Sequence, residues 1–291
     1  NPNIRQALNN RELLDTAEEI RIRQNKPIVI RKDCENFFMK NGEVCCMKDA
    51  FKPHKDEIQD TLSRMCEYSP YAYSDEIRRG FITIEGGFRV GIAGTAVECK
   101  DGISTIKYIN SLNIRISREL TGCADKVMKY VYGNTLIISP PGCGKTTILR
   151  DIIRQISNQG INISVVDERC EISGMYLGNI QFDLGICTDV LCCYSKSIGM
   201  NMMLRSMGPK IIAVDEIGSD EDILAIHNLL NSGVKIIATI HCDTIENILQ
   251  KPFIENIVKE KIFDSYIILN NNKKTGDLYK IYDKELNIVW Q

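Results

Sequence analysis

The chain has 291 residues, of which 44% are hydrophobic and 25% are charged, as in a folded globular protein long enough for two domains. Its 36 Lys and Arg residues against 38 Asp and Glu residues give a net charge of −2, which excludes a general basic field for holding nucleic acid. No apolar run approaches the ~20 residues of a membrane span, and the polar first residues differ from a signal sequence. These features predict a cytoplasmic protein.

Cysteines are numerous but show no ligand spacing. The chain has 12 cysteines and no C-x-x-C motif. The closest groups are the adjacent pair Cys45 and Cys46 and the adjacent pair Cys192 and Cys193, with Cys187 shortly before the second pair. Adjacent residues of a strand point to opposite faces and cannot readily share one tetrahedral metal ion. We therefore expect reduced, mostly buried thiols.

The first half of the chain has the pattern of an α+β domain built from hairpins. Alternating apolar residues predict strands, and Asn-Gly and Gly-Gly pairs predict tight turns between them. The expected elements in chain order are a helix within residues 4–17, strands at 20–23 and 28–30, a hairpin turn at 41–42, helices at 56–68 and 75–79, a hairpin turn at 86–87, and a strand at 111–120.

Three arginines of this half are candidates for a nucleotide site. Arg89 lies in the second predicted hairpin, and Arg115 and Arg118 lie on or just after the last predicted strand. Solvated strand faces are the plain alternative, because arginine is mostly exposed in folded proteins. The functional interpretation depends on the second half of the chain.

The second half opens with a phosphate-binding motif between residues 135 and 156, TLIISPPGCGKTTILRDIIRQI. A short β-branched run predicts a buried strand, and apolar residues at helical spacing from Thr147 predict a helix. Glycines at 142 and 144 let the backbone aim successive N–H groups at an anion, beside the positive end of the helix dipole. Lys145 is expected to reach the β and γ phosphates, and Thr146 to hold Mg²⁺. The residues assigned to nucleotide binding are Pro141, Gly142, Cys143, Gly144, Lys145, Thr146 and Thr147.

Two positions of this motif carry further expectations. Ser139 replaces the first glycine of G-x-x-x-x-G-K-[ST] and would be strained if that position needs a positive φ. Cys143 lies inside the loop at a helix N-terminus, where a thiolate is expected to be favoured.

Acidic residues follow two further β-rich runs. The run INISVVDERCEI places Asp167, Glu168 and Glu171 at the end of a predicted strand, facing the ligand crevice of an open α/β sheet. A solvated loop of charges is the alternative. The run KIIAVDEIG places Asp215 where it can hold Mg²⁺ and Glu216 where it can orient or deprotonate an attacking water.

The remaining elements complete an α/β pattern. Helices are expected at residues 195–206 and 220–231, and a third buried strand, KIIATIH, ends at His241. A histidine at this position can sense the γ-phosphate, although a structural role is equally compatible with the pattern. A strand at YIILN and a hairpin of DLYKIYD and LNIVW close the chain.

Arginine is scarce in the predicted ATPase half. No arginine follows Arg205, and only Arg150, Arg154 and Arg169 precede it there. Oligomeric P-loop ATPases commonly use an arginine to neutralise γ-phosphate charge. We therefore expect Arg89, Arg115 or Arg118 to complete the site from the first half.

The acidic run VVDERCEI, the VDEIG motif and the strand-end ATIH together resemble type II and type IV secretion and pilus ATPases. The runs EIRIRQNKP, GGFRVGIAG and SLNIRISRELTG resemble the stage III sporulation protein AA family, which is related to those motors. The resemblance implies an α/β fold in which a RecA-like P-loop ATPase domain, residues 123–291, follows a smaller α+β domain, residues 1–122.

The resemblance also implies a function. It implies a homohexameric ATPase that uses ATP and Mg²⁺, docks on a membrane-embedded sporulation channel protein, and lies on the cytoplasmic mother cell side of the forespore membrane. By motif, Glu168 or Glu171 takes the acidic-box role and His241 the histidine-box role. The alternatives are a ring scaffold with little hydrolysis and a RecA-type nucleic-acid translocase. Nucleic acid is not expected as a partner, because the net charge is −2.

Overall fold

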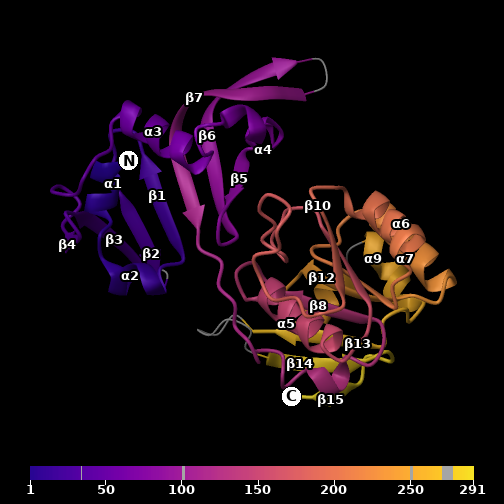
Figure 1. Cartoon of the computed structure of the whole chain (residues 1–291). Helices are drawn as coiled ribbons and strands as arrows, with labels where there is room; N and C mark the ends of the chain where they lie inside the picture. The colour runs from indigo at the N-terminus through magenta and orange to yellow at the C-terminus, as the bar shows by residue number, and fades with distance from the viewer. Residues whose placement is uncertain (34, 100–101, 250–251, 271–277) are drawn as a thin grey trace. The chain divides into compact units, whose positions relative to one another are not determined.

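The computed structural model describes residues 1–33, 35–99, 102–249, 252–270 and 278–291 (Figure 1). It divides into two compact units. The first unit comprises Asn1–Ser117 and Tyr176–Asn179, and the second comprises Arg118–Met175 and Ile180–Gln291. No helix among the described residues is long and apolar enough to cross a membrane. The domains expected from the sequence, residues 1–122 and 123–291, stay a prediction.

The first unit is built on an antiparallel sheet with the strand order β4-β3-β2-β1-β7-β6-β5 among the described residues. Both predicted hairpin turns are confirmed, since Asn41 and Gly42 and then Gly86 and Gly87 all have positive φ. The strands are β1 (Glu19–Arg23), β2 (Val29–Lys32), β3 (Glu35–Lys40), β4 (Glu43–Cys45), β5 (Phe81–Ile84), β6 (Phe88–Cys99) and β7 (Gly102–Arg115).

Short helices cover the apolar side of this sheet. The single opening helix expected within residues 4–17 is two helices, because Asn10 accepts the Leu13 N–H at 3.0 Å and starts a new one. The buried core brings helix residues such as Ile4 and Ile58 against strand residues such as Ile22. The helices are α1 (Pro2–Ala7), α2 (Arg11–Thr16), α3 (Lys55–Met65) and α4 (Ser74–Arg78).

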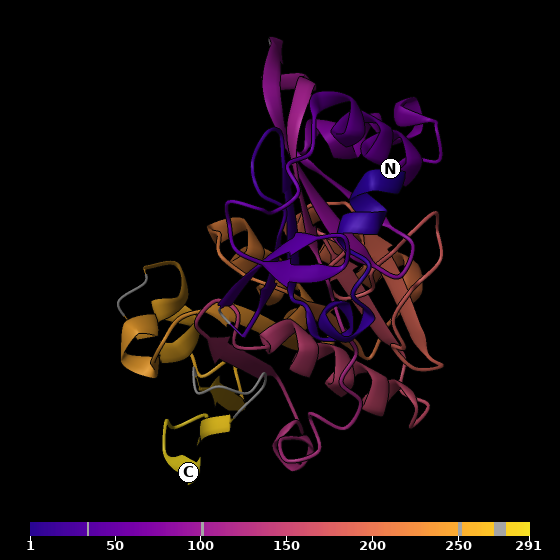
Figure 2. The ribbon, with the colours of Figure 1, turned by 90° about the vertical axis from the view of Figure 1, so that its left-hand side faces the viewer.

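Strand β7 differs from the strand expected at residues 111–120, since it begins at Gly102 and ends at Arg115, whereas β6 runs through the predicted alternating stretch. They form one hairpin that pairs from Arg89 with Arg115 to Cys99 with Gly102. Its outer part extends beyond the rest of the first unit's sheet (Figures 1 and 2). The sequence pattern missed the first half of β7 because its residues are mostly exposed, so apolar alternation is weak there.

The second unit contains the sheet β10-β9-β11-β12-β8-β13-β14-β15 among the described residues. Strands from β10 to β13 in this order pair in parallel, and the predicted C-terminal hairpin adds antiparallel β14 and β15. The strands are β8 (Thr135–Ser139), β9 (Ile163–Asp167), β10 (Thr188–Cys192), β11 (Ile211–Val214), β12 (Lys235–His241), β13 (Ser265–Leu269), β14 (Leu278–Asp283) and β15 (Ile288–Trp290).

Both faces of the parallel sheet are covered, which explains its continuous apolar strands. Successive side chains of β8 point to opposite faces, so Leu136 packs with residues such as Ile226, and Ile137 packs with residues such as Ile152. Helix α5 lies on one face, and α6, α7 and α9 lie on the other (Figure 1). The helices are α5 (Lys145–Ser157), α6 (Lys196–Met207), α7 (Asp220–Asn231), α8 (Ile245–Leu249) and α9 (Pro252–Lys259).

Candidate functional site

The phosphate loop joins β8 to α5 at the carboxyl edge of the parallel sheet. Gly142 has φ 79° and Gly144 has φ 87°, both in the left-handed region that glycine tolerates. A Cβ on Gly142 would contact no atom within 4 Å, so the backbone conformation rather than space requires glycine there. Left-handed turns directly before a helix gather N–H groups into an anion-binding concavity, which fits a phosphate.

Ser139 is accommodated without backbone strain. It is the last residue of β8, is fully buried, pairs with His241 of β12, and does not have a positive φ. The expectation of strain at this position therefore does not apply, because the loop's left-handed residues lie further along the chain.

The expected thiolate at Cys143 is wrong. The residue is only 4% exposed, and this burial raises the pKa of its thiol despite the nearby Lys145 charge.

Lys145 is buried and lies at the centre of a polar cluster whose other members are partly exposed. Its ammonium Nζ lies 3.3 Å from Glu216 Oε1 and 3.0 Å from His241 Nδ1. His241 Nε2 lies 2.7 Å from the same Glu216 oxygen. Lys145 Nζ also lies 2.9 Å from His241 Nε2, so the ammonium faces both ring nitrogens and Nε2 is shared between Lys145 and Glu216. The cluster joins residues of α5, β12 and the end of β11.

Asp215 is held by two hydroxyl groups. Thr146 Oγ1 donates to Asp215 Oδ2 at 2.6 Å, and the Thr239 hydroxyl donates to Oδ1. The described residues contain no group of three or more His, Cys, Asp or Glu side chains arranged around a metal ion. Mg²⁺ nevertheless fits the Thr146 and Asp215 oxygens, because it takes few protein ligands and completes its shell with phosphates and water.

Glu216 has an unusual backbone conformation. Its φ is 57°, which costs a non-glycine residue on the order of 1 kcal/mol. Its N–H donates to Thr239 Oγ1 at 2.8 Å, which fixes this turn. Burial alone would raise the pKa of Glu216, but the charges of Lys145, His241 and Arg169 lower it overall. The carboxylate is therefore ionised and positioned.

Asp167 lines the crevice at the strand ends as expected, but its carboxylate is bound by its own loop. Its buried carboxylate accepts hydrogen bonds from the backbone and hydroxyl of the loop that follows: Glu171 N at 2.9 Å, Ile172 N at 3.1 Å, Ser173 N at 2.8 Å and Ser173 Oγ at 2.6 Å. Burial raises the pKa of Asp167, against the effect of these donors. Asp167 therefore fixes the conformation of residues 168–173, the acidic loop. Glu168 and Glu171 of this loop are partly exposed.

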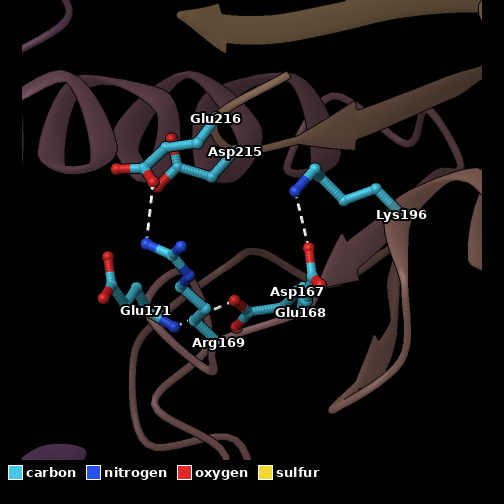
Figure 3. Close-up of a pocket in the computed structure, with 7 residues that line it drawn as sticks. All are labelled: Asp167, Glu168, Arg169, Glu171, Lys196, Asp215 and Glu216. Atoms are coloured by element: carbon cyan, nitrogen blue, oxygen red, sulfur yellow. Dashed lines mark hydrogen bonds and ion pairs between the residues drawn. The ribbon is translucent and has the colours of Figure 1, made fainter. Parts of the chain in front are cut away.

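A pocket joins the acidic loop to the end of β11 (Figure 3). Figure 3 shows Arg169 reaching Glu216, with NH1 2.9 Å from Oε2, and Lys196 reaching Glu168, with Nζ 2.6 Å from Oε2. The pocket is lined by Asp167, Glu168, Arg169, Glu171, Lys196, Asp215 and Glu216. Both candidate acidic-box residues thus lie beside the Asp215 and Glu216 pair.

Arg150 has a structural role. Its guanidinium is buried and donates to the carbonyls of Ile172 at 2.9 Å, Arg118 at 3.0 Å and Glu171 at 2.8 Å. It also stacks on the Phe182 ring at 3.9 Å. These contacts support the acidic loop and occupy all three nitrogens.

The arginines expected from the first half lie in different places. Arg89 and Arg115 are cross-strand neighbours in the first unit, and Arg89 stacks on the Phe81 ring at 3.8 Å. Arg118 is the first residue of the second unit. A contact between any of these three and a nucleotide stays a prediction.

Sequence reasoning assigned no role to Arg169, Lys196 or Thr239. Thr239 could have been found, because it precedes His241 by two residues on one strand and shares its face. Arg169 lies within the acidic run VVDERCEI, in which only the carboxylates were assigned roles. Lys196 had no local signal, since it meets Glu168 only through the pairing of β9 with β10 and the start of α6.

Comparison with solved structures identifies the fold. The chain is similar to the ATPase DotB of Legionella pneumophila, with a TM-score of 0.58, 13% identity, and coverage of 93% of this chain and 79% of that one. It is also similar to the pilus retraction motor PilT with bound ADP, with a TM-score of 0.57, 16% identity, and coverage of 88% and 75%. The fold is therefore that of the RecA-like P-loop secretion ATPases.

Comparison of sequences gives the family. The chain is 36% identical over 282 residues to stage III sporulation protein AA of Bacillus subtilis (strain 168), covering 94% of this chain and 88% of that protein. The family model described as sporulation stage III, protein AA matches residues 1–289. The resemblance seen in the sequence motifs is confirmed, and the chain belongs to the sporulation stage III protein AA family.

Proposed function

We propose that the second unit binds and hydrolyses ATP with Mg²⁺ at the carboxyl edge of β8, β11 and β12. The observation that carries the proposal is the convergence of Lys145, Thr146, Asp215, Glu216 and His241, from three separate stretches of chain, into one hydrogen-bonded cluster. A structural cluster would not need a left-handed phosphate loop beside it.

Each side chain has a distinct task in this proposal. A phosphate in the loop competes with Glu216 for the Lys145 ammonium, so binding frees the Glu216 carboxylate to orient or deprotonate water. Thr146 and Asp215 hold the Mg²⁺, which neutralises charge developing on the phosphate oxygens. His241 reports the γ-phosphate to β12. The acidic-box role belongs to Glu168 or Glu171, both of which line the same pocket.

The wider role is an oligomeric motor of the secretion ATPase type. Membership of a sporulation family supports a role in sporulation, and the likeness to proteins named as an ATPase and a retraction motor supports energy transduction. We propose a hexamer that works from the cytoplasmic mother cell side. It energises a membrane-embedded channel towards the forespore, and Arg89, Arg115 or Arg118 completes the nucleotide site.

Phosphate release from ATP with Mg²⁺ tests the proposal, measured together with the mass of the protein in solution. Lys145→Ala should lower turnover about 10²-fold to 10³-fold, by analogy with the loss of one preorganised donor. Lys126→Ala is the matched control, because Lys126 is an exposed lysine of the same unit. ATP-dependent hexamers with turnover lost only in Lys145→Ala are expected.

Two other outcomes would contradict the proposal. Hexamers that form with ATP but release no phosphate above the Lys145→Ala level would identify a scaffold that uses nucleotide to set its shape. Retained turnover in Lys145→Ala would place hydrolysis at another site.

A further inference from the structure

Two thiols meet next to the acidic loop. Cys170 Sγ lies 3.2 Å from Cys193 Sγ, although the residues are 23 positions apart in sequence. Cys170 follows Arg169 in the loop after β9, and Cys193 follows the last residue of β10. The parallel pairing of Cys192 with Asp167 brings the two strand ends side by side. The approach is therefore a product of the sheet register.

The backbone holds both cysteines in conformations that direct them together. Cys170 has φ 54° and Cys193 has φ 60°, both left-handed and uncommon for a residue with a side chain. The Cys193 N–H donates to the Asp167 carbonyl at 3.2 Å, and the Asp167 carboxylate fixes the other end of the loop. Such strained conformations persist only where the surrounding structure enforces them.

The neighbouring thiol, that of Cys192, contacts Cys170 and also a hydroxyl group. Cys192 Sγ lies 3.2 Å from the hydroxyl oxygen of Ser173. No set of three or more His, Cys, Asp or Glu side chains in the described part of the chain is arranged to hold a metal ion. A two-sulfur reaction therefore fits this cluster better than a thiolate metal site.

The two thiols differ in access. Cys170 is 7% exposed, and its contact with Cys192 and its burial raise the pKa of its thiol. Cys193 is half-buried and is the sulfur that a reagent in solution reaches first.

We propose that Cys170 and Cys193 form a reversible disulfide when the chain meets a low-molecular-weight disulfide. The Cys193 thiolate attacks the reagent and releases one of its halves as a thiol. The Cys170 sulfur then attacks Cys193 and releases the second half. One S–S bond forms in the protein, two S–H bonds are lost, and the two electrons reduce the reagent to two thiols. A dithiol reductant reverses the reaction.

The bond would act on the pocket described above. A disulfide requires the sulfurs to approach to about 2.05 Å, so the loop carrying Arg169 and Glu171 must shift and is then tied to β10. This consequence rests on the proposed ATPase function, whereas bond formation does not. We expect turnover to fall roughly 10-fold, because a displacement of ~1 Å beside a reacting centre commonly has a large effect.

Peptide mapping of the whole chain tests the bond without nucleotide. The protein is treated with oxidised glutathione, free thiols are blocked, and the chain is cut with trypsin and chymotrypsin. Trypsin alone leaves Cys170, Cys187, Cys192 and Cys193 in one peptide, because no Lys or Arg lies between Arg169 and Lys196. Chymotrypsin then cuts after Tyr176 and Phe182, so a Cys170–Cys193 bond joins two separate fragments.

Single Cys→Ser variants identify which two sulfurs form the bond. The cross-link should persist in Cys187→Ser and Cys192→Ser and disappear in Cys193→Ser and Cys170→Ser. Absence of the cross-link in the wild type, or its retention in Cys193→Ser, would overturn the proposal.

The functional consequence is measured separately. Phosphate release should recover after treatment with dithiothreitol in the wild type and should not respond to oxidised glutathione in Cys193→Ser. A cross-link without any change in turnover would refute the effect on the pocket, whereas a chain without turnover under reducing conditions would refute the proposed function instead.

Discussion

Two neighbouring strands of the second unit, β9 and β11, each lead into an Asp-Glu pair, and the two aspartates have different hydrogen-bond partners. Strand β9 ends at Asp167 before Glu168, and β11 is followed by Asp215 and Glu216. The strands are directly paired in parallel, so both Asp-Glu pairs lie at one sheet edge. Asp167 is 2% exposed and bonds to its own loop, whereas Asp215 bonds to the hydroxyls of Thr146 and Thr239.

The difference comes from what each aspartate meets. The chain after Asp167 curls back and offers three backbone N–H groups and a hydroxyl. The chain after Asp215 has a left-handed residue at Glu216 and then continues to α7. The Asp215 carboxylate oxygens therefore contact side chains of other elements. The position of a carboxylate at the end of a strand is therefore not enough to identify it as catalytic. Its hydrogen-bond partners are needed as well.

The glutamates should show the largest contrast. Glu216→Gln removes the ionised group that contacts Lys145 and His241, and should lower turnover about 10³-fold, within the usual range for a general base. Glu168→Gln, the matched change on β9, should lower turnover by a smaller factor, because Glu168 contacts Lys196 at the edge of the pocket, and a loss beyond a few-fold would assign the acidic-box role to Glu168 rather than Glu171. Phosphate release at saturating ATP checks both. Equal losses would show that the two pairs share one task.

The aspartates should show the opposite contrast in stability. Asp167→Ala leaves buried N–H groups without an acceptor and should lower the free energy of unfolding by about 3 kcal/mol. Asp215→Ala should lower it by only about 1 kcal/mol, because just two hydroxyl donors lose their acceptor and one of them, on Thr146, is partly exposed. Urea denaturation followed by circular dichroism measures both values. A larger loss in Asp215→Ala would reverse the structural assignment.

Arg169 connects the two Asp-Glu pairs, since it lies in the loop after β9 and contacts Glu216 at the end of β11. Arg169→Ala removes one of the charges that lower the pKa of Glu216, so that pKa should rise. The acid limb of the pH–turnover profile should therefore move to higher pH. Lys196→Ala is the control, because Lys196 pairs with Glu168 and should leave the limb in place.

The smallest effect concerns stability against pH. The pKa of Glu216 is lowered on folding, so its ion pairs stabilise the chain above the ordinary carboxyl pKa and are lost as the pH falls through the lowered value. The stability difference between wild type and Glu216→Gln should therefore shrink on acidification below about pH 4.3. Asp167 has a raised pKa and the opposite sign, because its contribution is lost as the pH rises. Urea midpoints over a pH series measure the change.

The sequence by itself determined the parts of the site that follow from local pattern. A buried strand, two glycines and a Lys-Thr pair require a phosphate loop, and the strand ends at Asp215 and His241 follow from apolar runs of strand length. The hairpin turns at residues 41–42 and 86–87 were also predictable, because few residues tolerate positive φ.

Which distant side chains contact one another depends on the tertiary structure. The inward turn of Asp167, the contact of Arg169 with Glu216 and the pairing of Cys170 with Cys193 all depend on the register of β9, β10 and β11. The order of parallel strands is set by crossover helices and the packing of both sheet faces. No local sequence pattern encodes that order, since every buried strand of this sheet has the same apolar character.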